Sequence, residues 1–209
     1  MAKEENLHMM KPQQAEFDNF QGQFTLIRVD TDLYNKYGKF LHEEKGLPIQ
    51  KVDEFLLAVK GVKLILGRSE PAHNLMVMSG RILHASLMVD DVTDFSGHLF
   101  PTYIHVGSGT NPPAIDDWKL ETPWATTYAI SPGGVRDSMS HCYWDATIPP
   151  TDTGTIAEAG LFLQAASPAG SPVDDPASYA QFSMLHRALF PTPIVKGATT
   201  EIIQYEAVF

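Results

Sequence analysis

The sequence contains a single cysteine, Cys142, among 209 residues. One cysteine excludes an intrachain disulfide framework and a cysteine-rich zinc site, and it fits assembly in a reducing compartment. Positive charge is also scarce, because 15 Lys and Arg residues stand against 25 Asp and Glu, for a net charge of −10. A nucleic-acid-binding protein needs a Lys/Arg-rich face to neutralise phosphates. We therefore expect no nucleic acid among the partners of this chain.

Long apolar runs are lacking as well. Charged residues interrupt every apolar run well before the roughly 20 residues that cross a bilayer, so we expect no membrane partner. Residues 1–14 contain no apolar stretch of the kind that signal peptides carry. The apolar share of 44% and the charged share of 19% are ordinary for a globular protein. The sequence therefore predicts a chain made in the cytoplasm with one buried core.

The chain divides into a polar arm and a single domain. Residues 1–22 show no sustained period and are predicted to form an extended N-terminal arm, which orders against a partner or remains a partly ordered terminus. Its strong apolar anchors are Phe17 and Phe20. Residues 23–209 are predicted to form the domain. The domain opens with a strand at Phe24–Asp30, which the sequence predicts to pair in a hairpin with Lys39–Glu44.

A helical insertion is predicted over about residues 48–88. Pro48 suits the start of a helix, where its missing N–H costs nothing, and apolar residues then recur at helical spacing at Ile49, Val52, Leu56 and Val59. Gly61 weakens the middle of this segment. The alternative is a helix that stops there and a strand at Val62–Leu66. Arg81–Met88 is the candidate for a second helix.

Short strands divided by turns follow residue 98. They are predicted at Thr102–Gly107, Met139–Ile148, Thr155–Gln164, Phe182–Phe190 and Thr200–Phe209. Pro191 and Pro193 are predicted to end the fourth of these strands, because proline cannot donate to a ladder. This spacing predicts a mainly β protein, an antiparallel β-sandwich with one or two helices in its N-terminal third. The last strand is predicted to be buried to its end at Phe209.

Histidines and acidic residues do not form a metal-binding motif in the sequence. His105, His141 and His186 lie in predicted strands, and no H-x-H, H-x-x-x-H or H-E-x-x-H pattern occurs. The acidic run at Asp90–Asp94 lacks the glycine and the terminal glutamate of an EF-hand loop. We therefore expect no metal-binding residue and no cofactor.

Catalytic motifs are missing too. The sequence has no G-x-S-x-G elbow and no Walker A lysine loop. The segment HVGSGTNPP is glycine-rich but runs into two prolines, so its glycines indicate a tight turn. Cys142 alternates with apolar neighbours, which is typical of a small buried side chain. We predict no catalytic residue and no enzymatic activity.

One pair of opposite charges is predicted to be buried. Glu158 lies between two alanines in one predicted strand, and Arg187 lies in another. If the two side chains pair inside the protein, removing one of them costs about 3–5 kcal/mol. The alternative is two unrelated surface charges.

Four segments, taken in order, resemble segments of tailed-bacteriophage virion proteins. HNLMVMSGRILHASLM resembles their H-x-N-L…G-R stretch, and HVGSGTNPPAIDDWKLETP is similar to a glycine-rich segment that follows it. TGTIAEAGLF resembles a T-I-x-E-x-G-L-F strand, and MLHRALFPTPIVKGATTEIIQYEAVF resembles the closing R-x-x-F-x-P-I-x-K pattern. Together these segments span residues 73–209. Residues 1–70 and the insertion SPAGSPVDDPAS depart from the pattern.

The resemblance implies a structural protein of the virion, built on a β-sandwich and located in the tail, baseplate, neck or fibre attachment. It implies homo-oligomeric contacts and other virion structural proteins as partners, and it supplies no catalytic residues. A second hypothesis is a host-receptor or glycan-binding tip that uses exposed aromatic residues, Trp118, Trp124 and Tyr128. A third is a hydrolase with carboxylates grouped across a cleft.

Overall fold

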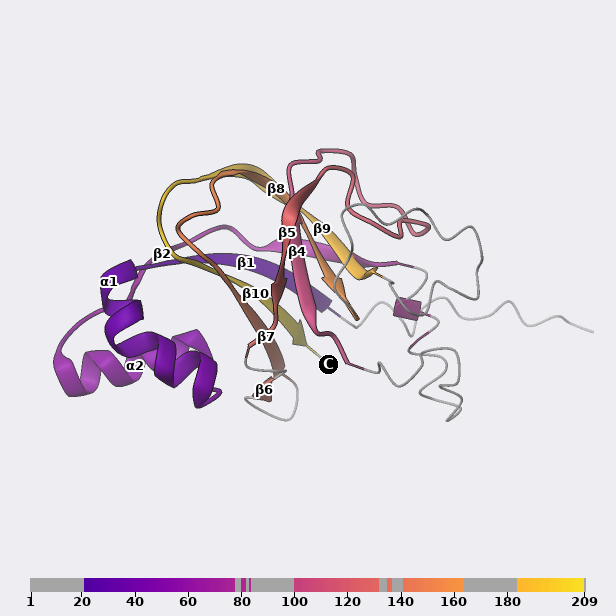
Figure 1. Cartoon of the computed structure of the whole chain (residues 1–209). Helices are drawn as coiled ribbons and strands as arrows, with labels where there is room; N and C mark the ends of the chain where they lie inside the picture. The colour runs from indigo at the N-terminus through magenta and orange to yellow at the C-terminus, as the bar shows by residue number, and fades with distance from the viewer. Residues whose placement is uncertain are drawn as a thin grey trace, which may run out of the picture.

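The computed structural model describes residues 21–77, 80, 81, 83, 100–131, 135, 136, 141–163 and 184–208. These residues form a mainly antiparallel β structure with a few short helices (Figure 1), which confirms the prediction of a mainly β, antiparallel protein with few helices. Most of the predicted arm, most of the second helix candidate, the acidic run at Asp90–Asp94 and Phe209 lie outside the described residues.

Ten strands in this part of the chain form one sheet in the order β5-β4-β8-β9-β3-β1-β10-β7-β6, and β2 pairs with β1 off this path. Their bounds are β1 Gln21–Val29, β2 Ile65–Arg68, β3 Ala72–Met76, β4 Tyr103–Gly107, β5 Pro123–Ala129, β6 Val135–Arg136, β7 His141–Ile148, β8 Gly154–Phe162, β9 Met184–Lys196 and β10 Glu201–Val208. Ile130, directly after β5, bridges to Ala146 in β7. The sheet therefore nearly closes on itself.

The main core fills the inner face of this sheet. As the alternation predicts, Ile203, Tyr205 and Ala207 of β10 share this core with Ala146 and Ile148 of β7. Tyr205 lies at its centre, with ring centroids 4.8 Å from Phe24 and 5.6 Å from Trp144. Burying one such large side chain stabilises the fold by about 1.5–3 kcal/mol.

A helical layer covers the other face of the sheet where β1, β10 and β7 lie side by side. It consists of α1 (Thr31–Leu33), the π-helical turns η1 (Tyr34–Gly38) and η2 (Phe40–Glu44), and α2 (Ile49–Lys60). The predicted hairpin strand at Lys39–Glu44 is therefore wrong. The apolar residues Leu33, Tyr37 and Leu41 recur every four positions, which is a helical period, and they pack against the second core cluster.

The end of α2 sets the course of the chain into the sheet. Gly61 takes a left-handed conformation at φ 67°, which glycine adopts without strain, and its N–H donates to Leu57 O at 3.0 Å. The helix therefore stops at Gly61, and a strand, β2, begins at Ile65. The structure differs here from the predicted helical segment 48–88, because β2 and β3 lie within it.

The course of β9 also differs from the prediction. The strand continues through Pro191 and Pro193, so the prediction that they end it is wrong. Its pairing with β8 shifts register between Glu158↔Leu189 and Ile156↔Ile194. The prolines fall in this irregularity, where the ladder does not need their missing N–H groups.

Candidate functional site

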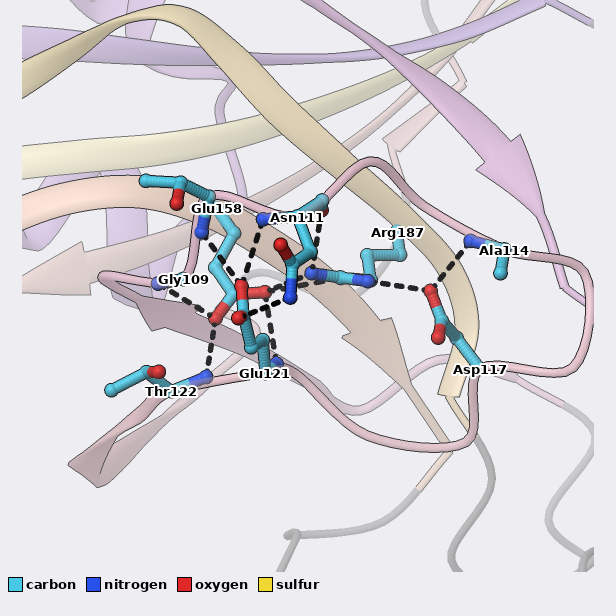
Figure 2. A network of polar contacts seen from close by, with 9 residues as sticks. Gly109, Asn111, Ala114, Asp117, Glu121, Thr122, Glu158 and Arg187 are labelled. Carbon is cyan, nitrogen blue, oxygen red and sulfur yellow. Dashed lines mark hydrogen bonds and ion pairs between the residues drawn. The ribbon is translucent and has the colours of Figure 1, made fainter.

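A buried ion pair anchors the loop that joins β4 to β5. Glu158 in β8 and Arg187 in β9 are both buried. Arg187 Nε donates to Glu158 Oε2 at 3.0 Å, and Arg187 Nη2 lies 2.9 Å from the same oxygen in an ion pair (Figure 2). The pair predicted from the sequence is therefore confirmed. The register places the two residues on adjacent strands, because Glu158 pairs with Leu189 two positions from Arg187.

The Glu158 carboxylate also receives three backbone N–H groups of the loop at residues 108–122. Oε1 accepts from Gly109 at 3.1 Å and from Thr122 at 2.8 Å, and Oε2 accepts from Glu121 at 3.1 Å. Gly109 lies near the start of the loop, whereas Glu121 and Thr122 lie at its end. One buried carboxylate therefore closes the loop at both ends.

Arg187 fastens the middle of the same loop. Nη1 donates to Asp117 Oδ2 at 2.6 Å, and Nη2 donates to the carbonyl of Asn111 at 3.1 Å. Burial opposes the charge on Arg187, but the hydrogen bonds and charges of Asp117 and Glu158 outweigh it and raise the Arg187 pKa. The guanidinium therefore stays charged. We call Glu158, Arg187, Asp117 and the loop that they hold the loop clasp.

Gly107, at the end of β4, and Gly109, in the loop, leave room for the loop backbone and for the buried carboxylate of Glu158. A Cβ atom on Gly109 would lie 2.5 Å from Glu158 Oε1, and one on Gly107 would lie 2.5 Å from Thr122 O. Neither distance is compatible with a side chain. The sequence predicted a tight turn as the reason for these glycines, whereas the structure shows a close approach to the buried carboxylate.

A second buried network joins the helical layer to the sheet. His42 in η2 lies between Tyr34 and Asp145, with Nε2 3.1 Å from Asp145 Oδ2 and Nδ1 2.9 Å from the Tyr34 hydroxyl. Asp145 also accepts from Gln204 Nε2 at 2.6 Å and from the Ile49 N–H at 3.2 Å. We call Tyr34, His42 and Asp145 the helix tie. It connects η1, η2, the start of α2, β7 and β10.

The helix tie has the order of a hydroxyl, an imidazole and a carboxylate, which also serves general-base catalysis. Here the hydroxyl is a phenol that is 1% exposed and contacts His42, Glu43 and Thr147. Burial raises the pKa of Tyr34, so the phenol is neutral. A substrate reaches this hydroxyl only if the helical layer lifts away. In this conformation the geometry is that of an internal support.

Lys196 forms a third polar connection. Its buried Nζ carries three N–H groups and lies within hydrogen-bonding distance of four backbone carbonyl oxygens: Asp152 at 2.7 Å, Thr199 at 2.8 Å, Pro149 at 2.9 Å and Gly197 at 3.2 Å. The ammonium thereby joins the β7–β8 turn to the β9–β10 turn. Burial lowers the pKa of Lys196, although the charges of Glu201 and Asp152 oppose this shift.

The three histidines that were predicted to lie in strands are in three different strands, β4, β7 and β9. His105 is buried in β4, with Nε2 2.7 Å from Trp124 O, and burial lowers its pKa. His141 lies 3.0 Å from Glu206, and His186 contacts Asn74 at 2.5 Å. Within the described residues, no group of three or more His, Cys, Asp or Glu side chains could hold a metal ion.

The aromatic residues proposed for glycan binding are less accessible than expected. Tyr128 is buried, and its hydroxyl donates to Asp152 at 2.9 Å, so the prediction that it is exposed is wrong. Trp118 and Trp124 are half-buried, and the Trp124 indole donates to Thr155 O at 3.2 Å. Cys142 is also half-buried rather than fully enclosed.

No family model, curated protein or solved structure matches the chain. In the part of the chain that the structure describes, no helix is long and apolar enough to cross a membrane. Function is therefore inferred from the residues and from their geometry.

Proposed function

We propose that the chain is a structural component of a tailed-phage particle that acts through protein–protein assembly. Its place in the particle is the tail, baseplate, neck or fibre attachment, and its partners are copies of itself and other virion structural proteins. One observation carries the proposal. The four segments that resemble virion proteins contribute to β3, β4, β8, β9 and β10, and four of these strands are consecutive neighbours in the sheet, in the order β4-β8-β9-β3. Segments that are distant in the sequence thus form one continuous part of the sheet.

The polar residues of these segments support an architectural role. Glu158 and Arg187 hold the loop at residues 108–122, and Lys196 holds two turns. Asn74 donates to the Tyr205 hydroxyl at 3.2 Å inside the sheet. These side chains form their hydrogen bonds within the chain. Such groups fix the shape of a protein, whereas a catalytic site keeps groups directed at a substrate.

The loop clasp has a direct use in assembly. Binding costs less free energy when the contacting loop is already ordered, because fewer rotamers and backbone states are lost. The loop at residues 108–122 is held at both ends and in the middle, and its Ile115 side chain remains exposed. We assign this loop as a preorganised contact for neighbouring proteins in the particle.

A complementation experiment tests the proposal. Phage that lack the gene for this chain are expected to accumulate incomplete particles, and supplied wild-type protein is expected to restore infectious particles. Ile115→Glu is expected to restore fewer particles than wild type while the isolated protein melts at an unchanged temperature. Thr126→Glu, at an exposed position on β5, is the control and is expected to behave as wild type. Normal particle yields without the gene would overturn the proposal.

A further inference from the structure

Four backbone carbonyl oxygens converge where the turn between β7 and β8 meets the turn between β9 and β10. Pro149 and Asp152 supply two of these oxygens, and Gly197 and Thr199 supply the other two. They lie 2.7–3.2 Å from the Nζ atom of Lys196, a residue that is 1% exposed. We call these four oxygens the carbonyl cage.

The surroundings of Lys196 contain more hydrogen-bond acceptors than its ammonium group can fill. An ammonium carries three N–H groups, so it cannot donate a separate hydrogen bond to each of the four oxygens. A further acceptor lies close by in sequence, because Glu201 follows Thr199 by two positions. In the part of the chain that the structure describes, Glu201 Oε2 is the one buried side-chain polar atom without a hydrogen-bond partner. This corner of the fold is therefore an environment for a cation and not for an anion.

The charges around the carbonyl cage also favour one positive charge inside it. The carboxylates of Glu201 and Asp152 attract a cation at the position of the Lys196 ammonium, whereas burial and the charge of Arg28 oppose it. Arg28 is itself paired with Glu201, with Nε 3.0 Å from Oε1. With a neutral group in the carbonyl cage, the two carboxylates would share the single charge of Arg28. A cation in the carbonyl cage therefore balances the charge of this corner.

The distances in the carbonyl cage indicate which cation fits. Calcium binds oxygen ligands at about 2.3–2.6 Å and magnesium at about 2.0–2.1 Å, and both ranges are shorter than the 2.7–3.2 Å observed here. Backbone carbonyl oxygens coordinate potassium in the selectivity filters of channels. A potassium ion and an ammonium group carry the same charge and have similar radii. The carbonyl cage therefore suits a monovalent cation of this size.

We propose that the carbonyl cage is a binding site for a monovalent cation of the size of potassium or ammonium, and that Lys196 fills it with a cation tethered to the chain. Because the ammonium is part of the chain, the two turns are joined without an ion from solution. The stability of the wild-type protein is then independent of which alkali cation is present. This inference does not rest on the proposed function, since it concerns the stability of the isolated chain.

Lys196→Ala tests the proposal, because it removes the side-chain atoms from Cγ to Nζ and leaves the carbonyl cage empty. In choline chloride the variant is expected to melt at a lower temperature than wild type. Potassium chloride is expected to raise its melting temperature by about 3–5 °C for each tenfold increase in potassium above half-saturation. Lithium chloride at the same ionic strength is expected to have no such effect, since lithium is too small to contact four oxygens at this spacing.

Lys196→Met is the matched control. The methionine side chain still fills the space of the lysine stem but carries no charge, so it blocks a cation from the carbonyl cage. This variant is expected to melt at one temperature in potassium, lithium and choline chloride, and so is the wild-type chain. An equal potassium response of all three proteins would reveal a general salt effect and would overturn the proposal. A Lys196→Ala variant that responds alike to potassium and lithium would do the same.

A second measurement covers a Lys196→Ala variant that does not fold in choline chloride. Potassium is expected to restore the circular dichroism of the folded chain, and so is propylammonium, which replaces the missing atoms from Cγ to Nζ. In crystals of the variant, rubidium is expected to give an anomalous peak between the four oxygens of the carbonyl cage. A chain that stays unfolded with all of these cations, or a crystal without a rubidium peak at this position, would contradict the proposal.

Discussion

The loop clasp and the helix tie stabilise two regions of one sheet by different physical means. The loop clasp is ionic: a buried guanidinium faces two carboxylates, and one of these carboxylates also holds three backbone N–H groups. The helix tie is a chain of hydrogen bonds through His42 and Asp145, which are 103 residues apart. The loop clasp orders a loop between neighbouring strands, whereas the helix tie holds a separate layer of structure against the sheet.

This difference predicts which region fails first when a partner is removed. A buried charge without its partner costs about 3–5 kcal/mol, whereas a lost hydrogen bond to a buried neutral group costs about 1–3 kcal/mol. Substitutions in the loop clasp should therefore lower the free energy of unfolding of the whole domain. Substitutions in the helix tie should act mainly on the helical layer.

The largest expected effect comes from Glu158→Ala. This change leaves Arg187 without one of its two carboxylate partners and removes the acceptor of the Gly109, Glu121 and Thr122 N–H groups. We expect the free energy of unfolding to fall by about 3–5 kcal/mol, measured by denaturant titration. Glu70→Gln is the control, because Glu70 is exposed and lies outside the loop clasp, so its change is expected to cost less than about 1 kcal/mol. Equal losses of unfolding free energy at both positions would show that the buried carboxylate contributes no more to stability than an exposed one.

The next largest effect is expected from Asp145→Ala in the helix tie. This change removes the acceptor for His42, Gln204 and the Ile49 N–H. We expect a loss of about 2–3 kcal/mol. Hydrogen exchange is expected to accelerate in residues 31–60, while β8 and β9 keep their protection. Uniform acceleration over the whole sheet would show that the helical layer does not open as a separate unit.

The two networks also differ in what the sequence could predict. Glu158 and Arg187 lie in strands that otherwise alternate with apolar residues, so an inward pair was a natural hypothesis. The hypothesis could not extend to Asp117 or to the backbone N–H groups, because these depend on how the β4–β5 loop folds back. His42 and Asp145 gave no signal at all. Their distance along the chain carries no spacing rule, and His42 falls in a segment predicted to be a strand.

The strands show the same limit. Those with clear alternation, such as β7 and β10, were predicted close to their bounds, because one of their faces lines the main core. The turns η1 and η2 were missed because a short apolar run fits either a strand or a helix. β9 was predicted to stop at Pro191, since the sequence does not reveal a register shift that accommodates proline. β5 was not predicted, because Tyr128 is the one residue of this strand that is fully buried.

Removal of the Lys196 charge is expected to have an effect between those of an ion pair and of a neutral hydrogen bond. Lys196 is a buried cation, but its hydrogen-bond acceptors are neutral backbone carbonyls. Lys196→Met keeps most of the volume of the side chain but leaves four carbonyls without this donor. We expect the free energy of unfolding to fall by about 2 kcal/mol, less than for Glu158→Ala, in a denaturant titration. Lys119→Met, at an exposed position, is the control and should change stability little. A loss equal to that of Glu158→Ala would mean that the four carbonyls around Lys196 and the carboxylate beside Arg187 contribute equally to stability.

A smaller effect is expected from Gly61→Ala at the end of α2. A Cβ atom there would meet nothing within 4 Å, so the cost comes only from the left-handed backbone at φ 67°. We expect a loss of about 1 kcal/mol in thermal or chemical unfolding. Gly67→Ala, which has equal space and no positive φ, is the control in β2. Identical effects of the two changes would exclude backbone strain as the cause.

The smallest expected effect is a pH dependence that originates beside the loop clasp. Burial lowers the pKa of His105 in the folded state, so near its unfolded pKa of 6.5 the unfolded chain binds more protons than the folded one. Stability is therefore expected to fall as the pH drops below about 6.5. His105→Gln is expected to reduce the difference in unfolding free energy between pH 7.5 and pH 5.5. An unchanged difference would show that other groups dominate the titration.

The central claim, that this chain is a structural protein of a phage particle, is tested most directly by counting it there. Quantitative mass spectrometry of particles purified through a density gradient measures the copy number of the chain relative to the major capsid protein. We predict a fixed number of copies per particle that stays constant across the particle peak. Absence of the chain from intact particles, or an amount that falls with each purification step, would contradict the claim.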